Sequence, residues 1–353
     1  ACFSTIYDRA KANDARFGVG SDIRLTPKPT SGAAHPTSLS QQFGVTGAAA
    51  TTPVVYSPQN AVLTSASNED VATLTAIDPR TYPSVGALQD SIFPGLTAQD
   101  ALGRLRDHPD GVLVDSKLAA GLKLKTGDEA HVLFARGTDQ QTRKAVRVLG
   151  LFTRFPGALQ GTDLVGDLGY YQRQTHLMQA DYFLVATADR SSAGLERTVR
   201  SLSALPNFAR SYDVQTSRGS LDKDQSSLTA LNVLGLLQIN SLFTFLMAAT
   251  ATAMFVFGLL MQRRREYVTL RTQGLLSREV RQLVLAESGV SAVLGALVGL
   301  GVGLVMASQF VQVLRPIFTL APPLRLPLPE LLVLAVLVLV ATALSALAAA
   351  VLI

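Results

Sequence analysis

The residues with the clearest chemical potential are six arginines close together near residue 270: Arg263, Arg264, Arg265, Arg271, Arg278 and Arg281. A guanidinium group keeps its positive charge and donates hydrogen bonds in a planar fork that suits carboxylates and phosphates. Glu266 stands among the arginines, and Gly274 separates two stretches with helical patterning. We interpret residues 262–287 as a basic helical segment that contacts another molecule. The alternative is a plain loop whose charges set membrane orientation and contact anionic lipid.

Residue types that support catalysis are present, but they lack the spacing that catalysis requires. The four histidines, His35, His108, His131 and His176, form no pair four residues apart. The sequence contains neither a G-x-S-x-G elbow nor a G-x-x-x-x-G-K-[ST] phosphate-binding loop. The single cysteine, Cys2, excludes an intrachain disulfide and a cysteine metal cluster. We therefore expect no catalytic residue, metal or cofactor in this chain, and we interpret each histidine as a surface or loop residue.

Three long runs without charged residues must position the arginines: 241–261, 288–314 and 331–353. Each can cross the roughly 30 Å hydrocarbon layer as a helix, which takes about 20 residues. Because positive segments stay on the cytoplasmic side, the arginines place residues before 230 on the opposite side. The sequence thus predicts a multi-pass protein of the inner or plasma membrane with a large extracytoplasmic domain.

Composition agrees with a hybrid of membrane and water-exposed parts. Hydrophobic residues make up 48 % of the chain, which is high for a soluble enzyme. The formal net charge of +5 could suit a nucleic-acid ligand. The arginine cluster already accounts for that charge through membrane orientation, so we expect no nucleic-acid partner.

The region before residue 230 shows strand and helix patterns in alternation. We expect helices at 97–106, with Thr97 as N-cap, and at 192–205. The expected strands lie at 22–26, 53–56, 72–77, 112–114, 130–134, 145–152, 180–186 and 211–215. This order predicts an α+β fold in which a strand–helix–strand subdomain is interrupted by a β-rich insertion, a small closed or sandwich-like β-structure.

These patterns divide the chain into seven segments. They are the end of a truncated membrane helix (1–6), an extracytoplasmic α+β domain (7–228), a stalk and membrane helix (229–261), a cytoplasmic coupling-helix region (262–287), a membrane helix (288–314), an outer loop (315–330) and a membrane helix (331–353). The membrane segments form an all-α bundle. Both ends of the sequence stop abruptly in apolar segments, so we expect a piece of a longer chain.

Two further features of the membrane segments suggest specific contacts. Gly295, Gly299 and Gly303 repeat every four residues, and this spacing lets a second helix approach closely. The alternative is that these glycines reflect composition only. Glu287 lies at the mouth of the 288–314 run, where an unpaired carboxylate is costly, so we expect an ion pair with one of the arginines.

The arginine-rich passage resembles a known family. Residues 263–274 are similar to the "R-R-x-E-x-x-x-L-R-x-x-G" passage of the FtsX-like permeases, which include the MacB-type exporters. Residues 285–288 and the glycine-rich run after them continue the likeness. Residues 118–128 resemble the family's "L-A-x-x-L-x-L-x-x-G-D" turn. Residues 75–79 resemble its "G-I-D-P" turn, with Ala76 in place of the usual glycine.

The resemblance implies a fold and a function. It implies a MacB-like periplasmic core with a β-rich insertion, and a permease subunit of an ABC-type (type VII) complex. ATP would be bound and hydrolysed on a separate ABC-type ATPase, whose motion reaches the extracytoplasmic domain through the 262–287 segment. The residues expected to couple to the ATPase are Arg263, Arg264, Arg265, Glu266, Arg271, Gly274, Arg278 and Arg281.

The resemblance leaves partners and cargo open. Members act in pairs, so we expect a second permease copy or a second half of a longer chain. One alternative is export or extraction of a lipid, lipoprotein or other amphiphile. Another is a mechanotransmitter that moves no substrate and activates a cell-wall hydrolase. A membrane-anchored receptor without a motor is a third alternative, in which the arginine-rich segment would be dispensable.

Overall fold

The computed structural model describes residues 2–29, 34–66, 68–158 and 161–226, together with scattered helical residues between 239 and 309. Its contacts divide the chain into two compact units. One is Lys11–Lys223, and the other joins Ala1–Ala10 with Asp224–Ile353. The fold below is that of the first unit and of the two helices that continue past its limits.

Nine strands and eight α-helices form the continuous described part of the chain. The strands are β1 (Ile23–Pro27), β2 (Ala48–Thr64), β3 (Glu69–Ile77), β4 (Val112–Asp115), β5 (Glu129–Phe134), β6 (Thr142–Phe152), β7 (Leu164–Asp167), β8 (Tyr182–Thr187) and β9 (Tyr212–Thr216). The α-helices are α1 (Cys2–Val19), α2 (Tyr82–Val85), α3 (Ala98–Asp107), α4 (Ser116–Leu122), α5 (Leu168–Thr175), α6 (Ser192–Ser203), α7 (Phe208–Ser211) and α8 (Ser217–Ser226). Two short 3₁₀ helices are η2 (Thr37–Phe43) and η3 (Asp90–Ile92).

The strands form one mixed sheet that closes on itself over part of its width. The order is β3-β7-β4-β6-β5-β2-β8-β1-β9, and β3 also pairs with β2. Strands β2, β3, β7, β4, β6 and β5 therefore make a closed ring, while β8, β1 and β9 extend from β2 as an open sheet. The ring strands all come from the chain between β1 and β8. This arrangement matches the predicted strand–helix–strand subdomain with a β-rich insertion.

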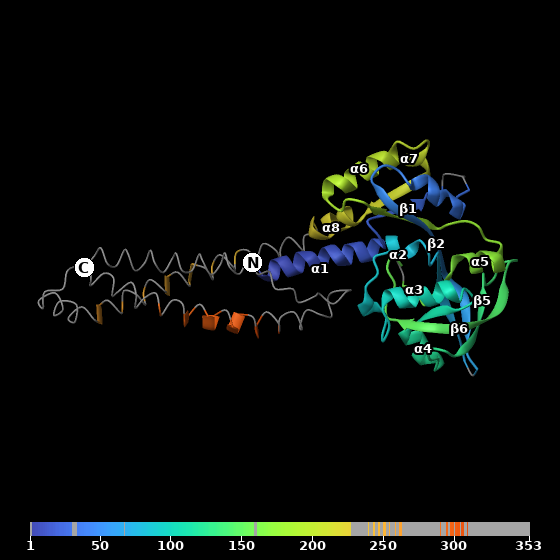
Figure 1. Cartoon of the computed structure of the whole chain (residues 1–353), viewed down its shortest axis with the longest axis horizontal. Helices are drawn as coiled ribbons and strands as arrows, with labels where there is room; N and C mark the ends of the chain where they lie inside the picture. The colour runs from blue at the N-terminus through green and yellow to red at the C-terminus, as the bar shows by residue number, and fades with distance from the viewer. Residues whose placement is uncertain are drawn as a thin grey trace, which may run out of the picture. The chain divides into compact units, whose positions relative to one another are not determined.

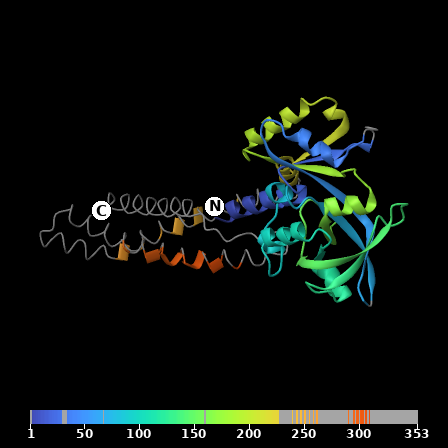
Figure 2. The same ribbon diagram turned by 45° about the vertical axis from the view of Figure 1, so that its right-hand side comes forward.

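Strand β2 belongs to both parts of the sheet (Figures 1 and 2). Its first half pairs with β8 as far as Val54, and its second half pairs with β3 and β5. Between Ser57 and Ala61 the register with β3 shifts, and Gln59 takes a positive φ of 52°. Such a bulge bends a strand and increases its twist. One strand can therefore leave the open sheet and enter the ring without a break.

Each part of the sheet has its own apolar core. In the ring, Leu63, Leu74, Val132 and Val148 are among the buried side chains that pack together. Helices α4 and α5 cover this core, contributing Ala119, Leu122, Leu168 and Tyr171.

The open sheet is closed over by aromatic side chains on the face that carries α6 and α7 (Figure 1). Phe43 lies 5.0 Å from Phe183 and 5.3 Å from Tyr212, measured between ring centroids, with both pairs edge-to-face. Phe208 completes this aromatic cluster. Edge-to-face geometry is favourable because the positive ring edge meets the negative ring face.

Several predicted elements are confirmed with their caps. Helix α3 begins after Thr97, whose hydroxyl accepts a hydrogen bond from the Asp100 amide. Helix α6 begins after Ser191 and ends before Pro206, as its apolar spacing indicates. Other predictions were incomplete. Strand β2 is far longer than the expected 53–56, and β7 with α5 was not predicted.

No helix made of the described residues is both long enough and apolar enough to cross a membrane. The predicted runs 241–261 and 288–314 fall outside the described residues except for scattered helical positions, and 331–353 falls outside them entirely.

The closed ring should depend strongly on its core. Leu63→Ala removes a fully buried side chain from β2, and we expect it to lower the free energy of unfolding by about 2–5 kcal/mol. Met178→Ala is the matched control, because Met178 is 50 % exposed and its loss should change stability by under about 1 kcal/mol. Thermal unfolding of the detergent-solubilised protein measures both. Equal effects would contradict the assignment of the ring core.

Candidate functional site at the base of α1 and α8

Most residues proposed from the sequence to couple to an ATPase lie outside the described residues. They are Arg263, Arg264, Arg265, Glu266, Arg271, Gly274, Arg278 and Arg281, and Glu287 with its expected ion pair lies there too. Their roles stay predictions.

The three spaced glycines are among the described helical positions. A Cβ placed on Gly295, Gly299 or Gly303 meets no described atom within 4 Å. The neighbouring Val298 and Val302 are 67 % and 56 % exposed. The described residues thus leave this stripe open, and close helix packing on it stays a prediction.

The chain passes between the two compact units at two points, once within α1 and once within α8. These helices attach to neighbouring strands, because α1 precedes β1 and α8 follows β9. The two strands are antiparallel, and Ile23 at the start of β1 pairs with Thr216 at the end of β9. Both helices therefore meet the sheet at the same end of one strand pair. Any motion passed along the chain between the units enters here.

A buried carboxylate holds this junction together. Asp22 is only 2 % exposed, and its Oδ1 accepts a hydrogen bond from Nε of Arg16 in α1 at 2.7 Å. Its Oδ2 accepts bonds from the backbone amide and hydroxyl of Thr187 at the end of β8, at 2.9 and 3.2 Å. Its backbone oxygen accepts from the amide of Ser217, the first residue of α8, at 2.9 Å. We call Arg16, Asp22, Thr187 and Ser217 the Asp22 cluster.

The turn between α1 and β1 is fixed on its other side by α2. The buried Ser21 hydroxyl lies 2.8 Å from the Val85 oxygen and 3.1 Å from the Val185 oxygen. The Ala87 amide donates to the Gly20 oxygen at 2.9 Å. The end of α1 is thereby tied to α2 as well as to β8.

The connection between β6 and β7 links α1 to the closed ring. Its Gly157 amide donates to the Phe17 oxygen in α1 at 2.9 Å. Gly20 has a φ of +94°, and a Cβ there would lie 2.8 Å from the Gly157 Cα. Because both neighbours are backbone, this close approach requires glycine. Further along, the Asp163 carboxylate accepts from the Thr73 amide in β3 at 2.7 Å.

A buried arginine holds the same connection from β1. Arg24 is 2 % exposed, and its Nη1 donates to the Gly157 oxygen at 2.7 Å. Its Cζ lies 3.7 Å from the centre of the Tyr182 ring, a cation–π contact. Its Nε has no hydrogen-bond partner among the described residues. Burial lowers the pKa of Arg24, and Tyr182 acts in the opposite direction.

The arrangement is suited to transmitting force and offers little for catalysis. No group of three potential metal ligands occurs among the described residues. His35 was interpreted as a surface or loop residue, but it is buried, and its Nδ1 lies 2.9 Å from the Tyr212 hydroxyl. Burial lowers the pKa of His35, which favours the neutral imidazole.

Asp22 and Arg24 were not singled out from the sequence. The available signal was a pair of opposite charges at alternate positions beside Ile23 and Leu25 in a short apolar strand. Charges on the core side of such a strand are costly unless they have partners.

The C-terminal third of the chain matches a known family. Residues 239–353 match the model described as FtsX-like permease C-terminal. The resemblance read from residues 263–274 is thereby confirmed, and residues 239–353 belong to this family. No curated protein matches the chain.

Three solved structures share part of the fold at low sequence identity. The periplasmic region of MacB from Actinobacillus actinomycetemcomitans is 14 % identical, with a TM-score of 0.42, over 60 % of this chain and 96 % of that one. The extracellular domain of the noncanonic ABC-type transporter YknZ from Gram-positive bacteria is 14 % identical, with a TM-score of 0.39, over 56 % and 99 %. A domain of a putative permease protein from Porphyromonas gingivalis is 12 % identical, with a TM-score of 0.35, over 57 % and 88 %.

The close approach of Gly20 to Gly157 can be tested by adding one methyl group. Gly20→Ala places a Cβ against backbone and forces a positive φ, so we expect stability to fall by about 2 kcal/mol or more. Gly18→Ala, two residues earlier in α1, meets no atom within 4 Å and should be neutral or stabilising by up to about 1 kcal/mol. Thermal unfolding in detergent compares the two. A neutral Gly20→Ala would mean that the contact is loose.

The Asp22 cluster predicts an unusually costly loss of one carboxylate. Asp22→Ala leaves the buried Thr187 amide without its acceptor and Arg16 without its partner, so we expect a loss of about 3–5 kcal/mol. Asp213→Ala is the control, since that carboxylate is 68 % exposed and pairs with Lys28 at 3.4 Å. Such surface pairs contribute at most about 1 kcal/mol. A difference of under about 1 kcal/mol between the two variants, measured by denaturant unfolding, would argue against the cluster.

Proposed function

We propose that this chain is the permease subunit of an ABC-type complex of the type VII class. It transmits the motion of a cytoplasmic ATPase to residues 11–223, which lie outside the cytoplasm, and so exports or extracts a lipid-linked or amphiphilic substrate. The observation that carries the permease role is the family match over residues 239–353.

The sequence supports a separate ATPase. It contains no phosphate-binding loop of the G-x-x-x-x-G-K-[ST] type, so ATP hydrolysis belongs to a partner subunit. The arginine-rich segment 262–287 presents fixed positive charges on the side where positive segments remain. A partner with carboxylates at its surface can pair with them through charge-assisted hydrogen bonds.

The structure supports a route for the motion. A displacement of α1 acts directly on Asp22 through Arg16 and on Gly157 through the Phe17 oxygen. From Gly157 the chain continues to Asp163, which is bonded to Thr73 in the ring. The Asp22 cluster carries the same displacement to β8 and α8. Because buried, bonded groups cannot move independently at low cost, α1, the open sheet and the ring move together.

Two variants of the 262–287 segment test the coupling. We expect Arg271→Glu and Gly274→Pro to separate ATP hydrolysis from release of a lipid-linked substrate in proteoliposomes, with at least about tenfold less release per ATP. Arg271→Lys keeps the charge and Gly274→Ala keeps the helix, so both controls should retain most coupling. Membrane insertion is checked in parallel by protease protection of residues 11–223. Full coupled release by Arg271→Glu and Gly274→Pro would contradict the assignment.

The partners themselves can be identified by mass spectrometry of the complex purified in mild detergent. An ABC-type ATPase together with lipid or lipoprotein would support the proposal. A cell-wall hydrolase in place of the lipid would favour mechanotransmission, and the absence of any ATPase would overturn both.

A further inference from the structure

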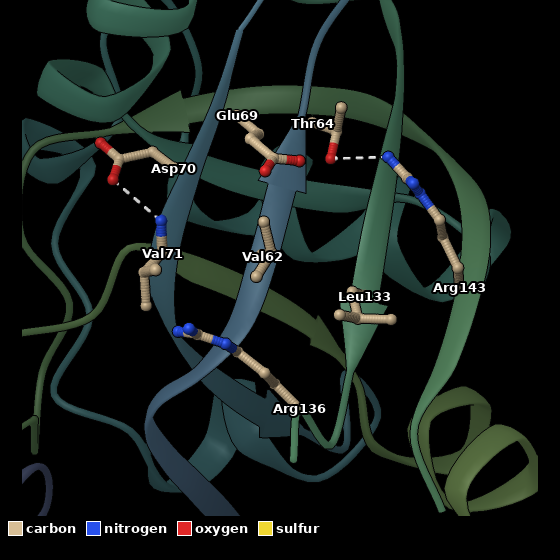
Figure 3. Close-up of a pocket in the computed structure, with 8 residues that line it drawn as sticks. All are labelled: Val62, Thr64, Glu69, Asp70, Val71, Leu133, Arg136 and Arg143. Atoms are coloured by element: carbon tan, nitrogen blue, oxygen red, sulfur yellow. Dashed lines mark hydrogen bonds between the residues drawn. The ribbon is translucent and has the colours of Figure 1, made fainter.

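A groove on the outer face of the closed ring carries the next inference. It has a volume of about 360 Å³ and lies across β3, β2, β5 and β6. Its lining residues are Val62, Thr64, Glu69, Asp70, Val71, Leu133, Arg136 and Arg143 (Figure 3). Nothing in the proposed function uses this groove.

The floor of the groove is an aliphatic row fixed by strand register. Val62 in β2 pairs with Val71 in β3 on one side and with Leu133 in β5 on the other. Leu133 pairs with Arg143 in β6, so the row ends in a cation. Val71 is 40 % exposed, and only Met178 joins it as an exposed large apolar side chain among the described residues of 11–223. The remaining large apolar side chains described in this unit are at least partly covered.

The walls of the groove carry opposite charges that do not pair with each other. Glu69 and Asp70 lie on β3, and Arg143 lies on β6. None of the three forms an ion pair with any described residue. Nη2 of Arg143 donates to the Thr64 hydroxyl at 2.9 Å, which directs its guanidinium inward over the groove (Figure 3). Asp70 Oδ1 accepts from the Val71 amide at 2.8 Å, which leaves Glu69 as the uncommitted carboxylate.

We propose that this groove is a contact between two copies of the chain, related by a two-fold axis that runs parallel to the strands between β2 and β5. Such an axis brings β6 of one copy over β3 of the other and β5 over β2. Val62 then faces the second copy's Leu133, and Arg143 faces the second copy's Glu69. Each ion pair occurs twice by symmetry.

The charge pattern selects a second copy over other occupants. A two-fold interface must be self-complementary, because the same patch supplies both sides. A purely anionic ligand would be repelled by Glu69 and Asp70, and a purely cationic one by Arg136 and Arg143. An aliphatic row with an arginine on one side and a glutamate on the other is its own complement after the two-fold rotation. Two sheet faces packed about 10 Å apart would also fill the groove with interdigitating side chains.

This inference goes beyond the proposed function, since it requires neither an ATPase nor a particular substrate. It adds a contact within the two ring domains, far along the chain from the membrane segments. The two proposals fail separately, because substrate release measures the first and position-specific crosslinking measures the second.

Crosslinking between differently tagged copies of the full chain tests the axis. In a Cys2→Ser background, Val62→Cys copies and Leu133→Cys copies are co-expressed and treated in native membranes with a short bismaleimide. We expect the mixed pair to crosslink at least about fivefold more than either variant alone. Met178→Cys, exposed and outside the groove, is the control and should not crosslink with either. Equal crosslinking by Val62→Cys alone, or none in the mixture, would overturn the proposed arrangement.

Charge reversal provides a second readout that misfolding cannot imitate. Glu69→Arg alone and Arg143→Glu alone each replace two attractive pairs by repulsive ones. Each should therefore reduce the mixed Val62–Leu133 crosslink about fivefold or more, as expected for two exposed pairs of about 0.5 kcal/mol each. Combining a Glu69→Arg copy with an Arg143→Glu copy restores both pairs and should restore the crosslink. If neither reversal reduces it, or if the combination fails to restore it, the proposed pairing is wrong.

Discussion

The buried carboxylate of Asp22 is the interaction on which the junction of this protein depends. A carboxylate removed from water is costly unless its oxygens are fully bonded, and here both oxygens accept hydrogen bonds. The donors come from α1 and from the end of β8, and the Asp22 backbone binds the start of α8. Elements more than 160 residues apart in the chain are therefore held by one residue. Small shifts of α1 must be shared with its neighbours or must break a buried charged bond.

Arg24 sits in the opposite situation. It is as well buried as Asp22, yet its charge is met by a carbonyl and a tyrosine ring, and its Nε is not bonded to any described group. An apolar side chain of similar volume would avoid this cost. What Arg24 supplies is a directed bond to Gly157, the point where the β6–β7 connection crosses the end of α1. The position is thus one where geometry takes precedence over stability, as is common at sites that must hold a particular conformation.

The sequence predicts local structure well where the signal is local. Helices α3 and α6 have capping side chains and apolar spacing that identify them without any knowledge of the rest. Strand β2 was underestimated because Pro53 and Pro58 argue against a long strand, and only the bulge before Ala61 allows the pairing to continue. Strand β7 has four residues, too few for a periodic pattern. The junction could not be predicted in the same way, since the partners of Asp22 and Arg24 are set by the packing of distant segments.

The antiparallel pair formed by β1 and β9 has a mechanical consequence. Because α1 and α8 join this pair at the same end, opposed forces on the two helices would open its hydrogen bonds one after another, beginning at Ile23 and Thr216. Forces in a common direction leave that ladder unloaded and move the sheet as a rigid body. The domain therefore resembles a lever that resists being pushed or pulled as a whole and yields when its two arms are spread. The Asp22 cluster, which bonds to both arms at that end, works like the first tooth of a zip.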